Sequence, residues 1–337
     1  MTKNPFISVI VPVFNGSQHI GQCLDALNGQ SYTAYEIIVV DDASTDDSVE
    51  ICSRKGVKIL KLEQQSGPAV ARNFGSKRAR GEVLLFIDAD VVVHEDTIAR
   101  VANDFVERPD IAAVFGSYDD TPAVKDFVSQ YKNLMHHYVH QQSNPDACTF
   151  WAGCGAVRRE IFDKVGGFDG ERYPKPSIED IELGFRLHRM GNKILLDKEL
   201  QVKHMKRWGL FNLLRTDIFN RAIPWSNLIM QGRQRVNDLN LRMSDKICAG
   251  LVGLIVGILP FSILRIQLLY FIPLFLVIIF ILQRRLYTFF LDRKGRKFLA
   301  LAFPMHLLYF FYSAVTFVLC WIQRFVSEKL RSVPEGP

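Results

Sequence analysis

The stretch Val83-Leu84-Leu85-Phe86-Ile87-Asp88-Ala89-Asp90 gives the most direct indication of the fold. Five consecutive apolar residues predict a buried strand, and two carboxylates directly follow it. A helix cap needs only one carboxylate, so Asp88 and Asp90 together favour a ligand site. In open parallel sheets, ligands bind at the carboxyl ends of the strands.

Upstream of this stretch, short β-branched runs alternate with segments of helical periodicity. Their apolar spacing predicts strands and helices in turn at 7–13, 19–27, 36–40, 57–62 and 68–79. Ser44 and Thr45 are expected to cap a further helix. Strands that alternate with helices predict an α/β domain with a mainly parallel sheet and right-handed crossovers.

Polar side chains follow three of these predicted strands. Asn15 comes after the first strand, Asp41 and Asp42 after the second, and Asp88 and Asp90 after the fourth. Because the carboxyl ends of parallel strands meet at one edge of a sheet, we expect these side chains to lie close together. This edge is the predicted site.

The segment from 111 to 204 is less regular. It predicts further strands and helices at 112–116, 125–141, 150–157, 161–165, 178–190, 194–196 and 202. One of these helices carries His136, His137 and His140, and the spacing of two of them is compatible with a zinc site. A solvated or interfacial helix face is the interpretation that we favour.

The chain of 337 residues has a formal net charge of +6 and changes composition along its length. Charged and apolar residues are mixed up to about Arg242, whereas 247–322 is mostly Leu, Ile, Phe and Val. The first part has no basic, aromatic-rich patch, which argues against a nucleic-acid partner. The six cysteines form no CxxC pair, and the first six residues contain no apolar signal-peptide core.

These differences in composition predict a catalytic domain followed by a membrane module. The expected boundaries are 1–205 for the domain, 206–246 for amphipathic juxtamembrane helices, 247–325 for transmembrane helices and 326–337 for a tail. The apolar stripe from Trp208 to Ile229 is either an interfacial helix or ordinary core packing.

Three segments are candidate membrane spans, at about 247–264, 268–282 and 298–322. Arg265 separates the first two, and basic residues flank the pair on both sides, which places both of its ends in the cytoplasm. A third span would put the tail outside, although Arg324, Lys329 and Arg331 fit that rule poorly. The alternative is two spans, with a short segment that lies in the interface or re-enters.

Two chemical roles are expected at the strand edge. Asp88 and Asp90 offer hard oxygen ligands that suit Mg²⁺ or Mn²⁺, which in turn bind the oxygens of a diphosphate. Glu179 and Asp180 begin a predicted helix, and each carboxylate raises the pKa of its neighbour. A carboxylate tuned in this way is suited to act as a general base. The alternative is that the pair only complements the helix dipole.

Several motifs in order resemble those of the family 2 inverting glycosyltransferases, which have the GT-A fold, a Rossmann-like α/β architecture. The motifs are VPVFN at 11–15, VVDDASTD at 39–46, GPAVARN at 67–73, DAD at 88–90, GGFD at 166–169 and ED at 179–180. The resemblance extends from about Ile7 to His204 and does not include the apolar segments.

This resemblance implies a role for each matching position. Those expected to bind the nucleotide-sugar are Pro12, Phe14, Asn15, Asp42, Arg72 and Asp88. Asp90 and His204 would hold the metal together with Asp88, and Asp180 would be the base, with Glu179 beside it. The acceptor side would be formed by Trp151, Gly153 and Gly155, although core burial is an alternative for Trp151.

The implied reaction is metal-dependent transfer from a UDP-, GDP- or dTDP-sugar to a lipid-linked or cell-envelope acceptor, at the cytoplasmic face of the inner membrane. Polyprenyl-phosphate glycosyltransferases are similar in layout and are an alternative. They often carry Gln soon after the DxD, where this chain has Val91-Val92-Val93. An acceptor that is already a phosphate anion would need no base. Processive synthases are disfavoured, because Lys206-Arg207-Trp208 only faintly resembles their QxxRW motif.

Two other classes of protein fit the sequence less well. A non-catalytic membrane adaptor with a nucleotide-binding domain would not need Asp88, Asp90 and Asp180 together. A nucleotidyltransferase also uses paired aspartates, but it is expected to have a basic, Gly-rich phosphate loop after the first strand. That loop here is FNGSQ at 14–18, without Lys or Arg.

Overall fold

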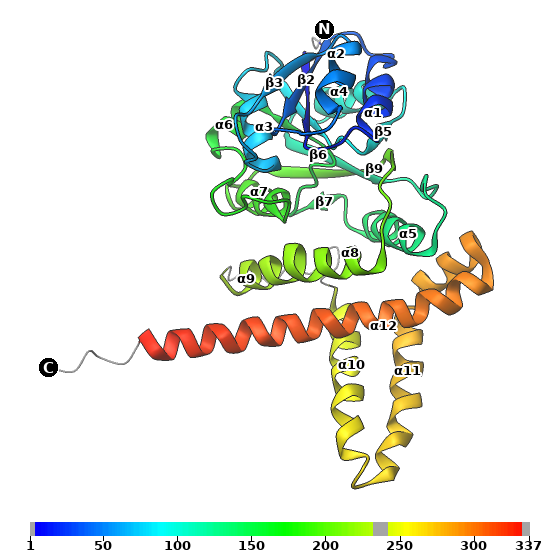
Figure 1. The fold of residues 1–337 in the computed structure, drawn as a ribbon. Helices are drawn as coiled ribbons and strands as arrows, with labels where there is room; N and C mark the ends of the chain where they lie inside the picture. Colours follow the sequence, from blue (N-terminus) through cyan, green and yellow to red (C-terminus); the bar gives the residue numbers. More distant parts are fainter. Residues whose placement is uncertain (1–3, 232–241, 332–337) are drawn as a thin grey trace, which may run out of the picture. The chain divides into compact units, whose positions relative to one another are not determined.

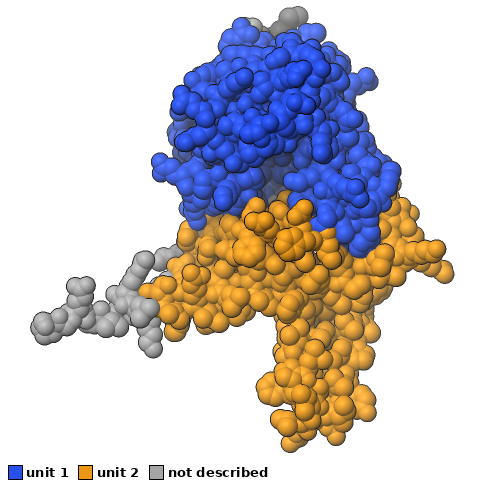
Figure 2. All heavy atoms as spheres, in the orientation of Figure 1, with its two compact units in different colours: residues 1–209 blue, residues 210–337 orange. Residues whose placement is uncertain are grey.

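The computed structural model describes residues 4–231 and 242–331. It divides into two compact units, Met1–Gly209 and Leu210–Pro337, which Figure 2 colours separately. The juxtamembrane segment predicted at 206–246 and the tail predicted at 326–337 lie partly outside the described residues. We call the two parts unit 1 and unit 2.

Unit 1 contains one mixed sheet of nine strands among its described residues. The strands are β1 (Ile7–Val13), β2 (Tyr35–Asp41), β3 (Lys58–Lys61), β4 (Val83–Ile87), β5 (Val91–Val93), β6 (Ile111–Tyr118), β7 (Asp146–Ala147), β8 (Cys154–Arg158) and β9 (Lys193–His204). Their spatial order is β3-β2-β1-β4-β8-β6-β9-β5, and β7 pairs with β9. Figure 1 shows this sheet in the upper part of the view.

The first four long strands form the parallel part of the sheet, as the alternation of strands and helices predicts. β1 pairs in parallel with both β2 and β4, and β2 with β3. β8 then enters antiparallel between β4 and β6, while β6 and β9 are parallel. The predicted α/β class is confirmed, and the sheet is mixed beyond β4.

In residues 4–209, seven helices cover the two faces of this sheet. They are α1 (Ile20–Asn28), α2 (Ser48–Arg54), α3 (Pro68–Ser76), α4 (Thr97–Glu107), α5 (Phe127–Gln142), α6 (Arg159–Lys164) and α7 (Glu179–Arg189). Side chains alternate across a strand, so Val9 and Val11 join a core with α1 and α4, while Ile10 joins a second core with α3, α6 and α7. Burial on both faces explains the continuous apolar strands.

Three local predictions differ from the structure. The segments 194–196 and 202 are one strand, β9, because β6 pairs with it on both sides of a register irregularity between Leu196 and Gln201, where the polar residues lie. The strand predicted at 150–157 begins only at Cys154. Helix α2 has Asp47 at its N-cap, and Ser44 and Thr45 bond to the loop after β1 instead of capping it.

Unit 2 is helical. Its elements are α8 (Leu210–Arg215), the π-helical turn η1 (Thr216–Ala222), α9 (Ile223–Gln231), α10 (Met243–Phe261), the 3₁₀ turn η3 (Ile266–Tyr270), α11 (Phe271–Leu282) and α12 (Arg284–Arg331). Among the described residues, α10 and the 284–327 part of α12 are long and apolar enough to cross a membrane. Length and composition therefore support membrane association.

Candidate active site

The loops that follow β1 and β2 are tied together at the carboxyl edge of the sheet. The Asn15 side-chain oxygen accepts hydrogen bonds from the Thr45 backbone N–H (2.8 Å) and hydroxyl (3.2 Å), and the Asn15 N–H donates to Ser44 Oγ (3.0 Å). Asn15 and Ala43 both have positive φ, at 49° and 62°. Strained backbone of this kind is concentrated at functional sites.

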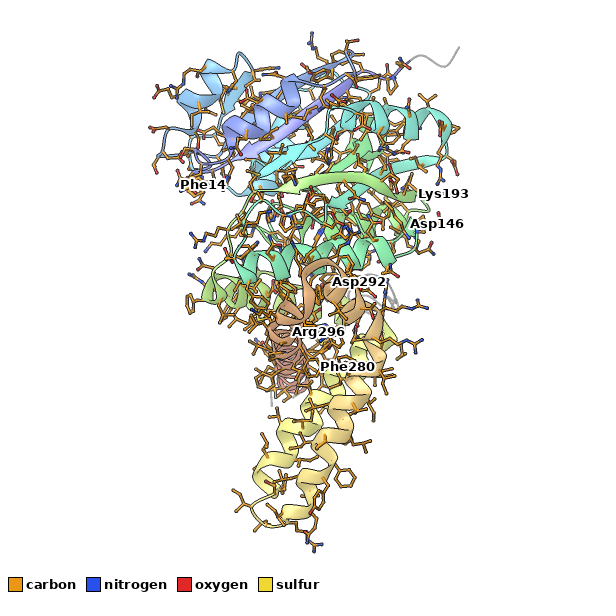
Figure 3. All side chains as sticks on the ribbon, turned by 90° about the vertical axis from the view of Figure 1, so that its right-hand side faces the viewer. Phe14, Asp146, Lys193, Phe280, Asp292 and Arg296 are labelled. Atoms are coloured by element: carbon orange, nitrogen blue, oxygen red, sulfur yellow. The ribbon has the colours of Figure 1, made fainter. Side chains whose placement is uncertain are left out.

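Pro12 and Phe14 are two predicted nucleotide contacts. Pro12 lies in β1, and Phe14 lies in the loop that follows this strand. Phe14 is 42% exposed, and Figure 3 shows its side chain projecting from the edge of unit 1. Pro12 lies in β1 opposite Val40 of β2. An exposed aromatic ring beside a strained loop provides a flat apolar surface on which a nucleotide base could stack.

Asp42 uses both carboxylate oxygens to shape the next loop. They accept hydrogen bonds from the backbone N–H groups of Ser66 (2.7 Å) and Gly67 (2.8 Å). Gly67 is the N-cap of α3 and has Pro at the first helical position. Asp42 therefore fixes the start of the helix that carries Arg72, and each oxygen keeps a further lone pair for a ligand.

Arg72 connects the strand end that carries Asp88 with the helix start that carries Glu179. Its guanidinium lies 2.7 Å from Asp88 Oδ1 and 2.9 Å from Glu179 Oε1, with only 5% of the side chain exposed. Within the described part of the chain, its Nε is buried and has no hydrogen-bond partner. A buried cation between two carboxylates fixes the end of β4 relative to the start of α7.

Asp90 faces a different partner from Asp88. Its Oδ2 lies 3.6 Å from His204 Nε2, at the end of β9. Burial alone would raise the pKa of Asp90, but contact with His204 and the charges of Lys206 and His19 hold it below its usual value. Asp90 is thus ionised near neutral pH, with an imidazole beside it.

Asp180 lies in the first turn of α7, where its oxygens accept hydrogen bonds from the backbone N–H groups of Ala152 (3.1 Å) and Ile181 (2.8 Å). Burial, and then the neighbouring charge of Glu179, raise the pKa of Asp180 to about 7. A carboxylate with such a pKa accepts a proton at neutral pH more readily than an ordinary aspartate.

The segment between β7 and β8 forms the wall beside Asp180. Trp151 is partly buried, and its ring packs edge-on against Tyr118 with a centroid distance of 4.8 Å. A Cβ atom at Gly153 would lie 2.3 Å from that ring, and one at Gly155 would lie 2.3 Å from the Trp151 carbonyl oxygen. Both glycines are therefore required for the close approach of Trp151.

Two of the three histidines of α5 are part of the core rather than of a solvated face. His137 and His140 are buried, and their Nδ1 atoms bond the carbonyl oxygens of Tyr118 (2.8 Å) and Gly116 (3.0 Å). The expectation of an exposed or interfacial face is wrong for these two residues. Among residues 4–231 and 242–331, no group of three or more His, Cys, Asp or Glu forms a metal cluster.

Comparison with known proteins decides the family of unit 1. Residues 8–166 match the family described as glycosyl transferase family 2. The chain carries a family 2 glycosyltransferase domain. It is 26% identical over 263 residues to the glycosyltransferase GlyG of Streptococcus pneumoniae serotype 4, a match that covers 73% of this chain and 82% of GlyG. Several further relatives match over less than half of their own length.

Solved structures confirm the GT-A fold of this glycosyltransferase. The mannosyltransferase PcManGT from Pyrobaculum calidifontis, in complex with GDP-Man and Mn²⁺, has a TM-score of 0.57 and 17% identity, over 96% of this chain and 88% of that one. S. aureus TarS in complex with UDP-GlcNAc has a TM-score of 0.51 and 22% identity, over 66% of this chain and 64% of that one.

The glycosyltransferase domain also places residues at the site that sequence patterns do not single out. The Tyr118 ring stacks on His204 at a centroid distance of 4.1 Å and an interplanar angle of 12°. The Lys206 ammonium lies 4.6 Å from the centroid of the Trp208 ring, in the segment that follows His204. Only pairing between β6 and β9 brings Tyr118 beside this segment, so no local motif could have revealed it.

Divalent metals are common among GT-A glycosyltransferases, and the donor set here fits one. Asp90 and His204 supply a carboxylate oxygen and an imidazole nitrogen within 3.6 Å of each other. Mn²⁺ and Mg²⁺ usually take one or two protein ligands and complete their shell with water and phosphate oxygens. Two protein ligands are therefore sufficient, and Asp88 is already engaged by Arg72.

Proposed function

We propose that the protein transfers a sugar from a nucleotide-sugar, with inversion at the anomeric carbon, to a lipid-linked or cell-envelope acceptor at the cytoplasmic face of the membrane. The nucleotide-sugar complexes of PcManGT and TarS support a donor of this class, which includes UDP-, GDP- and dTDP-sugars.

One observation carries this proposal: Arg72 binds Asp88 and Glu179 simultaneously, at 2.7 Å and 2.9 Å. Asp88 belongs to the strand end expected to hold the donor, and Glu179 begins the helix expected to hold the base. Because the guanidinium joins them, the donor and acceptor sides form one site. Preorganised charges at fixed positions are a principal source of rate enhancement.

The proposed division of labour follows from the charges. Asp90 and His204 would hold a Mg²⁺ or Mn²⁺ ion, which would neutralise the charge that develops on the leaving diphosphate. Phe14, Asn15 and Asp42 would surround the nucleoside. Asp180 would take the proton of the acceptor hydroxyl as its oxygen attacks the anomeric carbon.

The raised pKa of Asp180 indicates which chemical group of the acceptor attacks the sugar. A base is needed when the attacking group is a hydroxyl, and the raised pKa of Asp180, about 7, suits that task. A polyprenyl-phosphate acceptor is already an anion and requires no proton transfer. Asp180 therefore favours a hydroxyl acceptor on a lipid-linked or envelope glycan.

A membrane location is proposed from unit 2. Its apolar helices support a location at the membrane, where a lipid-borne acceptor is found. Basic residues at both ends of the segment 243–283, Arg242 and Lys246 on one side and Arg284 and Arg285 on the other, favour a cytoplasmic position for both ends. The same rule favours an active site in the cytoplasm, together with the nucleotide-sugars.

Donor hydrolysis by the full chain in detergent tests this function. A panel of UDP-, GDP- and dTDP-sugars is incubated with Mg²⁺, Mn²⁺ or chelator, and the released nucleoside diphosphate is measured. One donor is expected to be hydrolysed only with metal. Asp90→Ala is expected to lower the affinity for Mn²⁺ in the presence of the nucleoside diphosphate by at least ~10-fold, since one of two protein ligands is lost.

Asp96→Ala is the matched control, because Asp96 is an exposed aspartate near the start of α4. It should leave both Mn²⁺ affinity and hydrolysis unchanged. If no nucleotide-sugar binds in calorimetry with metal present, the transferase function is wrong and a non-catalytic adaptor becomes the better account.

A further inference from the structure

The helices α10 and α11 form a hairpin. α10 has 19 residues, which corresponds to about 28 Å at 1.5 Å per residue, close to the ~30 Å of a bilayer core. The returning leg, η3 followed by α11, reaches a similar length of about 28 Å. Arg265 lies in the turn between the legs. Both legs are thus long enough to cross a membrane.

Helix α12 takes a different direction. Its backbone is non-helical at Gly295, where φ is 80°, and the chain turns back there. From this turn α12 runs crosswise over one end of the hairpin in Figure 1, and it is seen nearly end-on in Figure 3, where the hairpin extends beyond it. Asp292, Arg296 and Phe280 mark that same end of the hairpin in Figure 3.

The core contacts of α12 lie in the half of the hairpin nearest this end. Phe310 packs in a core with Cys248 and Val252 of α10 and Ile279 of α11. Cys248 lies near the start of α10, Val252 lies at its midpoint, and Ile279 lies near the end of α11. A third span antiparallel to α11 would instead pack along the whole length of the hairpin.

On its other side, α12 packs against the helices that follow unit 1. The Tyr312 hydroxyl donates a hydrogen bond to the buried Asp217 of η1, at 2.8 Å. Further along, Thr316 and Cys320 are buried, whereas Phe317, Val318 and Leu319 between them are 42%, 50% and 60% exposed. One face of α12 is therefore covered by protein, and the other presents apolar side chains.

The hairpin, like α12, has large apolar side chains that are exposed. Beyond the α12 contact, the hairpin exposes a series of large apolar residues, namely Leu254, Leu259, Phe261, Ile263, Leu264, Ile266, Tyr270, Phe271 and Leu274. Exposed apolar surface of this extent marks an interaction with lipid or protein. The hairpin fits the bilayer core in length, so lipid is the environment of its exposed face, and that of α12 is continuous with it.

We propose that α12 lies in the plane of the membrane surface and is not a third span. The membrane module then consists of a two-span hairpin and an in-plane helix whose exposed face, from Val315 to Val326, binds phospholipid. This inference rests on the proposed membrane location and is independent of the transferase chemistry.

The placement of charge agrees with this topology. An in-plane α12 keeps its C-terminal end on the side where α10 begins, so Arg324, Lys329 and Arg331 of the sequence lie with the other cytoplasmic cations. Three spans would carry these cations across the membrane. Arg265 is then the one cation of the described hairpin residues 247–282 that is placed at the far surface.

Labelling with a membrane-impermeant maleimide in intact bacterial cells tests the topology. Single cysteines are introduced by Arg265→Cys, Ser327→Cys and Lys193→Cys, in a variant whose six native cysteines are replaced and whose donor hydrolysis is retained. Lys193 is an exposed residue of unit 1 and reports the side of the catalytic domain. Labelling after permeabilisation shows that each cysteine is reactive.

The proposal predicts labelling of the Arg265→Cys variant in intact cells, and labelling of the other two only after permeabilisation. Labelling of both the Arg265→Cys and Ser327→Cys variants in intact cells would establish a third span and overturn the in-plane helix, while the membrane location stands. Protection of all three in intact cells would show that the hairpin does not cross, which overturns the proposed topology and the spanning location together.

A second measurement distinguishes lipid from protein contact and does not require cysteine replacement. The full chain is placed in nanodiscs that contain brominated phosphatidylcholine, and Trp321 emission is obtained by difference from Trp321→Phe. Since Trp321 is 54% exposed on α12, we expect bromolipid to quench most of its emission. Unquenched Trp321 in discs that hold two copies would show that a second copy covers this face and would overturn lipid binding.

Discussion

Asp180→Asn is expected to lower the rate of sugar transfer by ~10²–10⁴-fold, the usual contribution of a general base. The asparagine side chain has a similar shape but does not take up the acceptor proton. Donor affinity should change little, because the hydrogen bonds that Asp180 accepts from the described residues come from the backbone of Ala152 and Ile181. Transfer rate and calorimetric donor binding are measured side by side.

The role of Asp180 as a base also predicts how the transfer rate changes with pH. The pKa of Asp180 is raised to about 7, so the carboxyl is protonated and inactive as a base below that pH. The wild-type kcat should rise as the pH increases through about 7 and then level off, and the residual rate of Asp180→Asn should lack this rise. The matched control is Asp163→Asn, at an exposed aspartate of α6, which should keep the wild-type profile. A wild-type profile in Asp180→Asn would assign the base elsewhere.

Arg72→Met is expected to destabilise unit 1 by about 3–5 kcal/mol and to abolish transfer. The substitution leaves Glu179 buried and Asp88 partly buried, both without their cation. For a domain of this size such a loss lowers the midpoint of thermal unfolding by roughly 10 °C. Thermal unfolding followed by intrinsic fluorescence and donor hydrolysis are the two measurements.

Two further variants separate charge from packing at Arg72. Adding Glu179→Gln to Arg72→Met removes one uncompensated carboxylate, so part of the stability should return while activity stays absent. Arg78→Met removes an exposed arginine stacked on Phe74 and should shift stability by no more than ~0.5 kcal/mol. If Arg72→Met is as stable and as active as Arg78→Met, the central role of Arg72 is wrong.

The parallel part of the fold can be predicted from sequence because its signals are local. β1, β2 and β4 are continuous apolar runs, since both faces of each strand are buried. The polar residues at their ends follow directly along the chain. The prediction is weaker where the strands that pair are distant in the sequence. β5 has only three residues, and its antiparallel partner β9 lies more than a hundred residues further along the chain.

The partners within the site could be predicted only in part. The sequence assigns Arg72 to the donor, whereas the structure commits its guanidinium to Asp88 and Glu179. That pairing depends on how α3 and α7 pack, which no spacing encodes. Tyr118 reaches His204 through the register of β6 and β9 for the same reason.

Hydropathy gives the extent of the apolar helices but not their direction. The segment 298–322 is long enough to span a membrane, so its hydropathy makes it a candidate third crossing. The course of α12 depends on the turn at Gly295 and on contacts such as that between Tyr312 and Asp217. These are tertiary features, so composition alone leaves the choice between two and three spans open.

The anomeric configuration of the sugar released from the donor tests the central claim most directly. The claim is a single in-line displacement in which Asp180 activates the attacking oxygen, and water can replace the acceptor. Proton NMR within the first minutes of donor hydrolysis records the configuration before mutarotation. The account predicts a sugar of opposite configuration to the donor. Release with retained configuration would contradict the single displacement and the role of Asp180 as its base.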